Sequence, residues 1–244
     1  MSASALATLA ALPPGLVWQA DRLARPAEAG MPTGFAALDA QLPGGGWPRG
    51  ALIELLGDAP GIGELGLLLP MLRAATAAAE RWIAWIAPPH LPYAPALAAA
   101  GIPLERLLLL TPDDHAETLW AIRQALASGG CEVVLAWLAR ADTAALRRLQ
   151  LAAEESATPL FLFRPAAAAI QSSPASLRLR LVPTTDALTL DILKRRGPAL
   201  AAPIRLTIPD RPTPPSRALD PTHDALVCAD PPRFAVAGIH ARRG

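Results

Sequence analysis

The stretch "LIELLGDAPGIGELGLLLP", Leu52 to Pro70, contains the features that decide the fold. An apolar strand leads into a glycine-rich turn, and the turn leads into an apolar helix, which is the order in which a phosphate-binding loop is built. In such a loop a lysine and a serine or threonine follow the last glycine. Neither is present here. When Gly57 and Gly63 are aligned with the loop glycines, the lysine position is occupied by Glu64.

A carboxylate at the lysine position disfavours binding of a triphosphate. Two unit charges ~4 Å apart interact by roughly 4 kcal/mol at an effective dielectric constant near 20, so exchanging attraction for repulsion is costly. Lys194 is the only lysine of the whole chain. We therefore predict that this degenerate phosphate loop, with Gly57, Gly61, Gly63 and Glu64, binds no ATP and that no cofactor is required. The structural alternative is a tight strand-to-helix turn in which Glu64 stabilises the helix N-terminus.

Length and composition are those of one α/β domain with tails: 244 residues, 52% hydrophobic, formal net charge +1. This near-neutral charge gives no support to a chain that binds nucleic acid or membrane through a global field. The two cysteines lack metal-ligand spacing to the histidines, so we predict no metal site and a buried thiol at Cys131. The N-terminus lacks the positive region of a signal peptide, and no apolar run is long enough to span a membrane, so we expect a cytoplasmic protein.

Apolar strands alternate with helices along the middle of the chain, and period-two segments follow near its end. The strands are expected at 51–57, 81–87, 107–111, 131–137 and 159–164, and the period-two segments at 176–183, 188–196 and 202–209. This order predicts an α/β fold with a mostly parallel, doubly wound sheet and an antiparallel C-terminal extension. We expect an N-terminal leader at 1–30, a core domain at 31–208 and a Pro-rich, disordered tail at 209–244.

Residues 31–208 resemble the core of the RecA recombinases. "MPTGFAALDAQLPGGGWPRG" (31–50) is similar to the segment that precedes the RecA phosphate loop. "GDAPGIGEL" (57–65), "WIAPPHLPYAPAL" (85–97) and "FLFRP" (161–165) resemble more specifically the ImuA family. These are RecA-like accessory proteins of a bacterial translesion synthesis cassette. The resemblance implies a RecA-like P-loop NTPase core and a role in SOS mutagenesis after DNA damage. It also implies the partners ImuB, an error-prone replicative-type DNA polymerase alpha subunit, and RecA as a further candidate.

The resemblance also implies that the catalytic positions are lost. The catalytic carboxylate expected after the second strand falls on Pro89, and the acid expected at the end of the Walker B strand falls on Trp137. Neither side chain can activate water or hold a magnesium ion. We therefore expect no catalytic residues and a pseudo-ATPase rather than an enzyme.

"LTLDILKRRG" (188–197) resembles the RecA strand whose basic residues reach a neighbouring protomer across the filament interface. Lys194, Arg195 and Arg196 are thus candidate contacts with a partner such as RecA. The alternative is a solvated strand end. Arg164 falls where RecA-like folds sense a bound ligand. Four tryptophans are expected in the core rather than on a binding surface, namely Trp82, Trp85, Trp120 and Trp137.

Three classes of function follow. The first, which we favour, is a non-catalytic RecA-like adaptor in a mutasome with ImuB and an error-prone polymerase, modulating RecA. The second is an ATP-dependent, recombinase-like DNA-binding protein with an unconventional P-loop, which the missing lysine and carboxylates disfavour. The third is a nucleic-acid-binding module without nucleotide chemistry, which the near-neutral charge disfavours.

Overall fold

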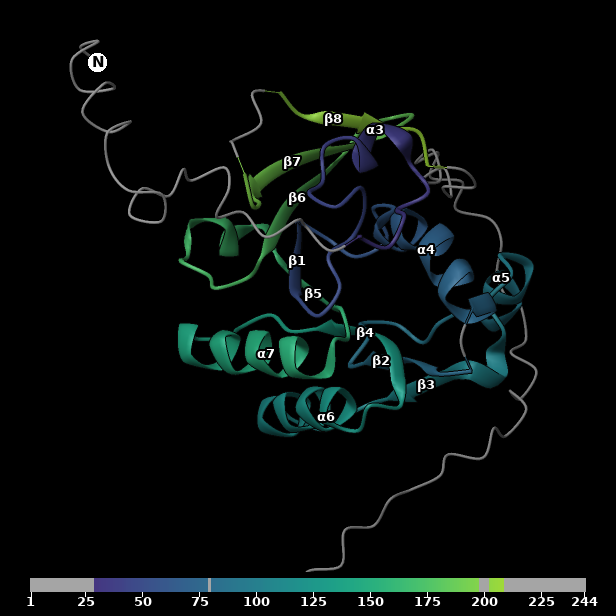
Figure 1. Cartoon of the computed structure of the whole chain (residues 1–244), viewed down its shortest axis with the longest axis vertical. Helices are drawn as coiled ribbons and strands as arrows, with labels where there is room; N and C mark the ends of the chain where they lie inside the picture. The colour runs from purple at the N-terminus through teal and green to yellow at the C-terminus, as the bar shows by residue number, and fades with distance from the viewer. Residues whose placement is uncertain (1–28, 79, 198–201, 209–244) are drawn as a thin grey trace, which may run out of the picture. The chain divides into compact units, whose positions relative to one another are not determined.

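The computed structural model describes residues 29–78, 80–197 and 202–208 (Figure 1), and all of them belong to one compact unit. The predicted tail at 209–244 and nearly all of the predicted leader at 1–30 lie outside the described residues. Both therefore stay predictions.

One mixed sheet forms the centre of the described part of the chain. Its strand order is β3-β2-β4-β5-β1-β6-β7-β8. All neighbours from β3 to β6 are parallel, whereas β7 and β8 are each antiparallel to the strand before them. The strands are β1 Leu52–Gly57, β2 Trp82–Ile86, β3 Leu107–Leu110, β4 Cys131–Trp137, β5 Leu160–Pro165, β6 Leu177–Pro183, β7 Leu188–Lys194 and β8 Ile204–Leu206.

Helices cover both faces of the sheet because successive strand residues point to opposite faces. Leu52 packs in the cluster of α6 and α7, and Ile53 packs in the opposite cluster with α4. The helices α6 and α7 lie side by side in Figure 1. The described helical segments are α3 Ala36–Asp39, α4 Glu64–Ala78, α5 Ala94–Ala99, η1 Leu104–Arg106, α6 His115–Ala127, α7 Thr143–Ser156 and η2 Ala166–Ile170.

Local sequence signals explain where the longer helices begin. Asp114 accepts a hydrogen bond from the Glu117 N–H at 2.8 Å, and Asp142 accepts one from the Ala145 N–H at 2.6 Å. These caps satisfy backbone donors that have no partner within the helix. Helix α4 continues through Pro70, so this proline does not begin a new helix.

The segment before β1 is part of the hydrophobic core. Met31 and Trp47 exchange backbone hydrogen bonds of 2.8 and 2.7 Å, which brings residues 31 and 47 side by side. Trp47 is fully buried, and its ring meets Phe161 edge-on at a centroid distance of 5.2 Å. The close approach requires Gly46, because a Cβ atom there would lie 2.2 Å from the Met31 carbonyl oxygen.

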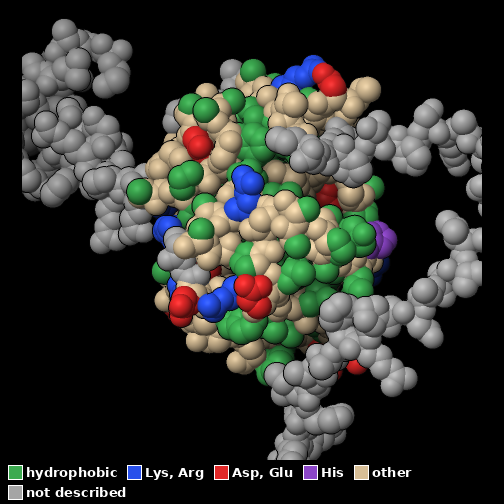
Figure 2. All heavy atoms as spheres, turned by 90° about the vertical axis from the view of Figure 1, so that its right-hand side faces the viewer, with side chains coloured by type: hydrophobic (Ala, Val, Ile, Leu, Met, Phe, Trp, Pro, Cys, Tyr) green, Lys and Arg blue, Asp and Glu red, His purple; other side chains and the backbone are tan. Residues whose placement is uncertain are grey.

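The prediction that four tryptophans are core residues is only half right. Trp85 is buried and Trp137 is partly buried against the core, but 43% of Trp82 and 56% of Trp120 are exposed. Trp120 is exposed because it lies on the outer side of α6, away from the buried positions Thr118, Ile122 and Ala125. Hydrophobic side chains are also visible between scattered charged groups on the face of the molecule shown in Figure 2.

In the loop between β1 and α4, the backbone is hydrogen-bonded to Glu64, the residue at the expected lysine position. The Gly61 N–H, which such a loop would offer to a phosphate, donates to the Glu64 Oε1 at 2.7 Å. Glu64 is buried, with 6% of its surface exposed. The Glu64 carboxylate therefore binds a backbone N–H group that a phosphate loop would offer to its ligand. The predicted RecA-like P-loop NTPase core is wrong, and the finding that overturns it is the family relationship reported with the functional site.

Candidate functional site

A cavity of about 390 Å³ lies at the carboxyl edge of the parallel strands. Residues at the ends of β1, β4 and β5 line it, together with the loop after β2. This edge is where ligands bind in open α/β sheets. Four residues singled out in the sequence meet here although they are far apart in the chain, namely Gly57, Glu64, Pro89 and Trp137. Their interpretation as lost catalytic positions stays a prediction.

Glu64 is the first residue of α4 and contributes a buried carboxylate to the cavity. Its Oε1 accepts the Gly61 N–H, whereas its Oε2 is buried and has no hydrogen-bond partner. The positive end of the helix dipole compensates part of the charge. The structural alternative considered for Glu64, a carboxylate that stabilises the helix N-terminus, therefore agrees with its position.

Aromatic rings form one wall of the cavity. Trp137 and Phe163 are register partners on β4 and β5, and their rings stack at 4.4 Å with an interplanar angle of 11°. Trp85 approaches Trp137 from β2 at 5.7 Å. Next to this wall, Ala87 has a φ of 53°, a left-handed conformation that non-glycine residues rarely adopt.

A buried ion network lies behind the cavity and involves residues of three adjacent strands. Glu54 on β1 accepts from the Arg164 Nη1 at 2.7 Å and from the Arg178 Nε at 2.5 Å. All three residues are buried. Arg178 also donates to the Ala168 carbonyl oxygen, and Arg164 donates to the Gln171 side chain. The network therefore connects the middle of the sheet to the segment that contains η2.

Glu54 and Arg178 are the residues that the sequence analysis missed. The signal was present, since "ALIELLG" places one acid in an otherwise apolar strand, and a buried charge needs a partner. Arg164 was expected to sense a ligand. It lines the cavity, but its guanidinium group is bonded to Glu54.

The predicted basic contacts do not reach this cavity. Lys194 pairs with Arg178 near the start of β6, so it lies at the opposite, amino edge of the parallel strands. Its Nζ donates to the Ser173 carbonyl oxygen at 2.8 Å, and the Arg195 Nη1 donates to the Gln41 carbonyl oxygen. Lys194 and Arg196 are exposed. Their role as a partner interface stays a prediction.

In the ranges that the structure describes, no group of three His, Cys, Asp or Glu residues could hold a metal ion. Cys131 is a buried free thiol, and burial raises its pKa, while a hydrogen bond from Ser128 and the charge of Arg81 oppose the rise. None of the described helices is both long enough and apolar enough to cross a bilayer.

The fold and the site define a class: an α/β domain with a mixed sheet whose carboxyl-edge cavity is acidic and aromatic. Comparisons with known proteins identify the family. The family described as "Cell division inhibitor SulA" matches residues 52–159. The SulA of Edwardsiella piscicida is 33% identical over 118 residues, which cover 48% of this chain and 70% of that protein. The chain belongs to the SulA family.

ImuA proteins are relatives too. "Protein ImuA" of Caulobacter vibrioides is 32% identical over 126 residues, which cover 50% of this chain. The matched part spans about half of that relative, 52% of its length. A crystal structure of SulA from Pseudomonas aeruginosa has 32% sequence identity and a TM-score of 0.40. The match covers 46% of this chain and 97% of that one.

These matches correct the predicted fold family and show where the SulA-like segment lies. The family that matches is SulA, so the assignment to a RecA-like P-loop NTPase core is replaced. The matched segment ends at residue 159, just before β5, yet β5 pairs with both β4 and β1. The sheet of this chain is therefore completed by residues beyond the SulA match.

Proposed function

We propose that this chain is a non-catalytic adaptor that acts in the SOS response to DNA damage. It would work in translesion synthesis with ImuB and an error-prone replicative-type polymerase alpha subunit, and it would modulate RecA. The similarity to the Caulobacter ImuA proteins, 32% over 126 residues, supports this assignment.

One observation carries the non-catalytic part of the proposal: the cavity suits no polyphosphate. Glu64 and Asp58 line it, and in the described part of the chain Arg164 is the one basic residue that does so. The charge of Arg164 is paired with Glu54, and its Nη1 lies 2.7 Å from the Glu54 Oε1. In and behind the cavity, the three carboxylates of Asp58, Glu64 and Glu54 outnumber the two guanidinium groups of Arg164 and Arg178, whereas phosphoryl-transfer sites surround the phosphates with cations.

The nucleotide part is tested by calorimetry. Titration of the full chain with Mg·ATP is expected to give no heat of binding, because the cavity repels the phosphates. Glu64→Lys restores the lysine of a phosphate loop and serves as the comparison variant. Saturable binding to the unmodified chain with a micromolar dissociation constant would contradict the proposal.

The partner part is tested by co-purification of the full chain with ImuB and with RecA, each with and without ATP. Recovery of a stable pair with ImuB supports an adaptor. Two results together would contradict it. These are no pair with ImuB in the co-purification, and an unchanged rate of damage-induced mutation in a strain from which the gene for this chain is deleted.

The basic residues at and just after the end of β7 allow a specific test of the proposed contact with RecA. Reversing charge in Lys194→Glu/Arg196→Glu is expected to weaken binding to ATP-loaded RecA by about tenfold or more, because exposed charges set the electrostatic complementarity of a contact. Arg195 stays unchanged in this variant since it contacts the Gln41 carbonyl oxygen. Biolayer interferometry would give the two dissociation constants.

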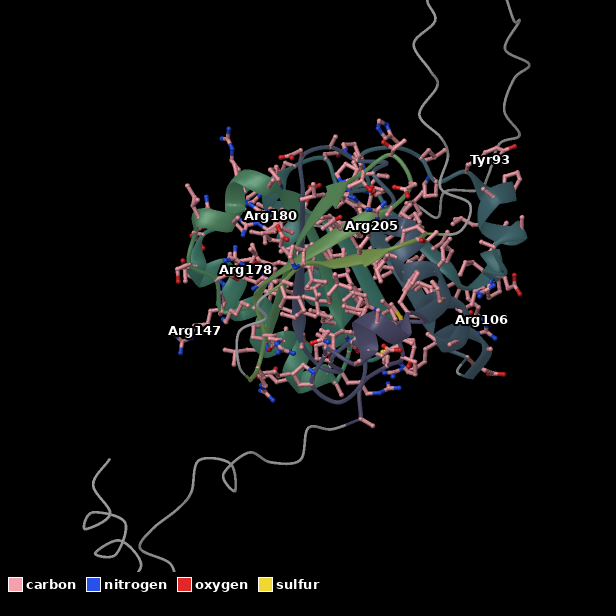
Figure 3. All side chains as sticks on the ribbon, turned by 90° about the horizontal axis from the view of Figure 1, so that it is seen from above. Tyr93, Arg106, Arg147, Arg178, Arg180 and Arg205 are labelled. Carbon is pink, nitrogen blue, oxygen red and sulfur yellow. The ribbon has the colours of Figure 1, made fainter. Side chains whose placement is uncertain are left out.

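A matched control for this variant is Arg147→Glu/Arg148→Glu on α7. Both arginines are exposed, and Arg147 points away from the fold in Figure 3. The Arg147→Glu/Arg148→Glu variant changes the net charge by the same amount at another surface and is expected to bind RecA with the affinity of the unmodified chain. Equal affinities of the Lys194/Arg196 variant and the unmodified chain would exclude that strand end as the contact.

A second candidate function is inhibition of cell division, because the Edwardsiella relative is named a cell division inhibitor. The 33% identity across 70% of that protein supports it. Controlled expression of the chain in its host separates the two candidates. Filamentous cells would favour a division inhibitor, whereas normal division with altered damage-induced mutation would favour the adaptor.

A further inference from the structure

Glu64 lines the cavity at the carboxyl edge, and one oxygen of its carboxylate has no hydrogen-bond partner among the described residues. The Glu64 Oε2 is buried without a hydrogen-bond partner, and no ion pair of Glu64 is present among the described residues. A buried carboxylate oxygen left without a donor costs free energy, since it has lost its contacts with water. A ligand that donates an N–H to this oxygen would remove that cost.

The walls of the cavity indicate which donor fits. Trp137 lines it and is held in place by the stacked ring of Phe163, and Leu55, Leu138 and Leu181 add apolar surface. A planar cation is attracted to the face of an aromatic ring, and tryptophan gives the strongest attraction. The guanidinium group is planar, carries five N–H donors and is more weakly hydrated than an ammonium group.

The charge around the cavity favours a cation. Asp58 and Glu64 line it, and behind it the Glu54 carboxylate pairs with both Arg164 and Arg178, so these five groups together carry a net charge of −1. An arginine also has an aliphatic chain that can pack along apolar walls while its charged end reaches a buried carboxylate. Arginine is one of the residues that most often anchor protein interfaces.

We propose that this cavity is a socket for the guanidinium group of an arginine presented by a protein partner, with Glu64 as its acceptor and Trp137 as its stacking surface. The inference rests on the proposed function only in taking the partner to be a protein. The socket itself is tested without that partner, so the two can fail separately.

The test uses N-acetyl-L-arginine amide as the probe and N-acetyl-L-citrulline amide as its neutral, nearly isosteric control. The full chain is labelled with ¹⁵N-tryptophan, and the indole signal of Trp137 is identified by its absence in Trp137→Phe. The arginine probe is expected to shift that signal saturably at millimolar concentrations, as suits a small fragment. The citrulline probe is expected to bind about tenfold more weakly or not at all, because it lacks the charge.

Glu64→Gln is the decisive variant. The glutamine Oε1 can still accept the Gly61 N–H, so the turn is preserved, but the NH₂ group then faces the ligand as a donor. The arginine probe is expected to bind this variant at least about tenfold more weakly, the loss that follows when a charged acceptor is removed. Glu155→Gln, an exposed change of the same type on α7, is the control and is expected to bind normally.

Three results would overturn the proposal: no shift of the Trp137 signal with the arginine probe, equal binding of both probes, or undiminished binding to Glu64→Gln. With the socket established, loss of ImuB from Glu64→Gln in co-purification identifies ImuB as the source of the arginine. Retention of ImuB on Glu64→Gln would instead exclude an ImuB arginine as the occupant and leave the adaptor function itself intact.

Discussion

Replacing Glu54 with glutamine is expected to lower the free energy of unfolding by about 3–5 kcal/mol. The change preserves the size of the side chain, so no cavity forms, but it removes the only negative charge of the buried network. Arg164 and Arg178 would keep their positive charges at side-chain exposures of 1% and 7%. Two like charges in a site of low dielectric constant, without a carboxylate between them, are the reason for the large effect. Urea unfolding followed by far-UV circular dichroism measures the difference.

The control for this prediction is Asp191→Asn on β7. Asp191 accepts from the Arg180 Nη2 at 2.5 Å, and the Arg180 side chain is 47% exposed. Arg178 and Arg180 lie on the same strand (Figure 3), but Asp191 pairs with one exposed arginine, whereas Glu54 pairs with two buried ones. Asp191→Asn is expected to cost no more than about 1 kcal/mol, because exposed ion pairs contribute little. Similar losses in the two variants would show that burial of the Glu54 network adds nothing to stability.

Replacing Trp47 with alanine is expected to lower the free energy of unfolding by about 3–5 kcal/mol. Trp47 lies before the segment that matches SulA, yet it is fully buried and packs edge-on against Phe161 of β5. The loss combines the apolar surface returned to water with the void left beside Phe161. Guanidinium chloride unfolding gives the free energy difference.

Trp82→Ala is the matched control for Trp47. It removes the same side chain from a position that is 43% exposed at the start of β2. We expect a loss well below that of Trp47→Ala, because less apolar surface leaves water on folding. A Trp47→Ala protein as stable as Trp82→Ala would mean that burial of the Trp47 side chain adds little to stability.

The Glu54 prediction concerns contacts between the SulA-like segment and the rest of the chain, whereas the Trp47 prediction concerns a contact between the two parts of the chain that flank this segment. Glu54 lies inside the matched residues 52–159, and Arg164 and Arg178 lie beyond them. Trp47 precedes the segment, and its partner Phe161 follows it. A large loss in Glu54→Gln would mean that the matched segment depends on residues beyond it, and a large loss in Trp47→Ala would mean that the flanking parts of the chain stabilise each other.

The glycine loop is a local motif, and only part of what was predicted from it applies to this protein. The missing lysine and the acid at position 64 predicted a degenerate phosphate loop, and in the structure this acid accepts the Gly61 N–H. The same stretch also favoured a RecA-like core, and the SulA match replaced that assignment. A strand, a glycine turn and a helix in succession are local features, and several families can share them.

The sequence by itself determined the approximate positions of the strands, because hydrophobic periodicity acts over a few residues of backbone. It also determined that the chain has a single lysine, and that this lysine is not in the loop. Only the tertiary structure decided the order of the strands and the pairing of Glu54 with residues 110 and 124 positions away. It alone placed Glu64 beside Trp137 and placed Lys194 at the opposite edge. These contacts depend on how distant strands pack into one sheet, and no pattern of neighbouring residues specifies that packing.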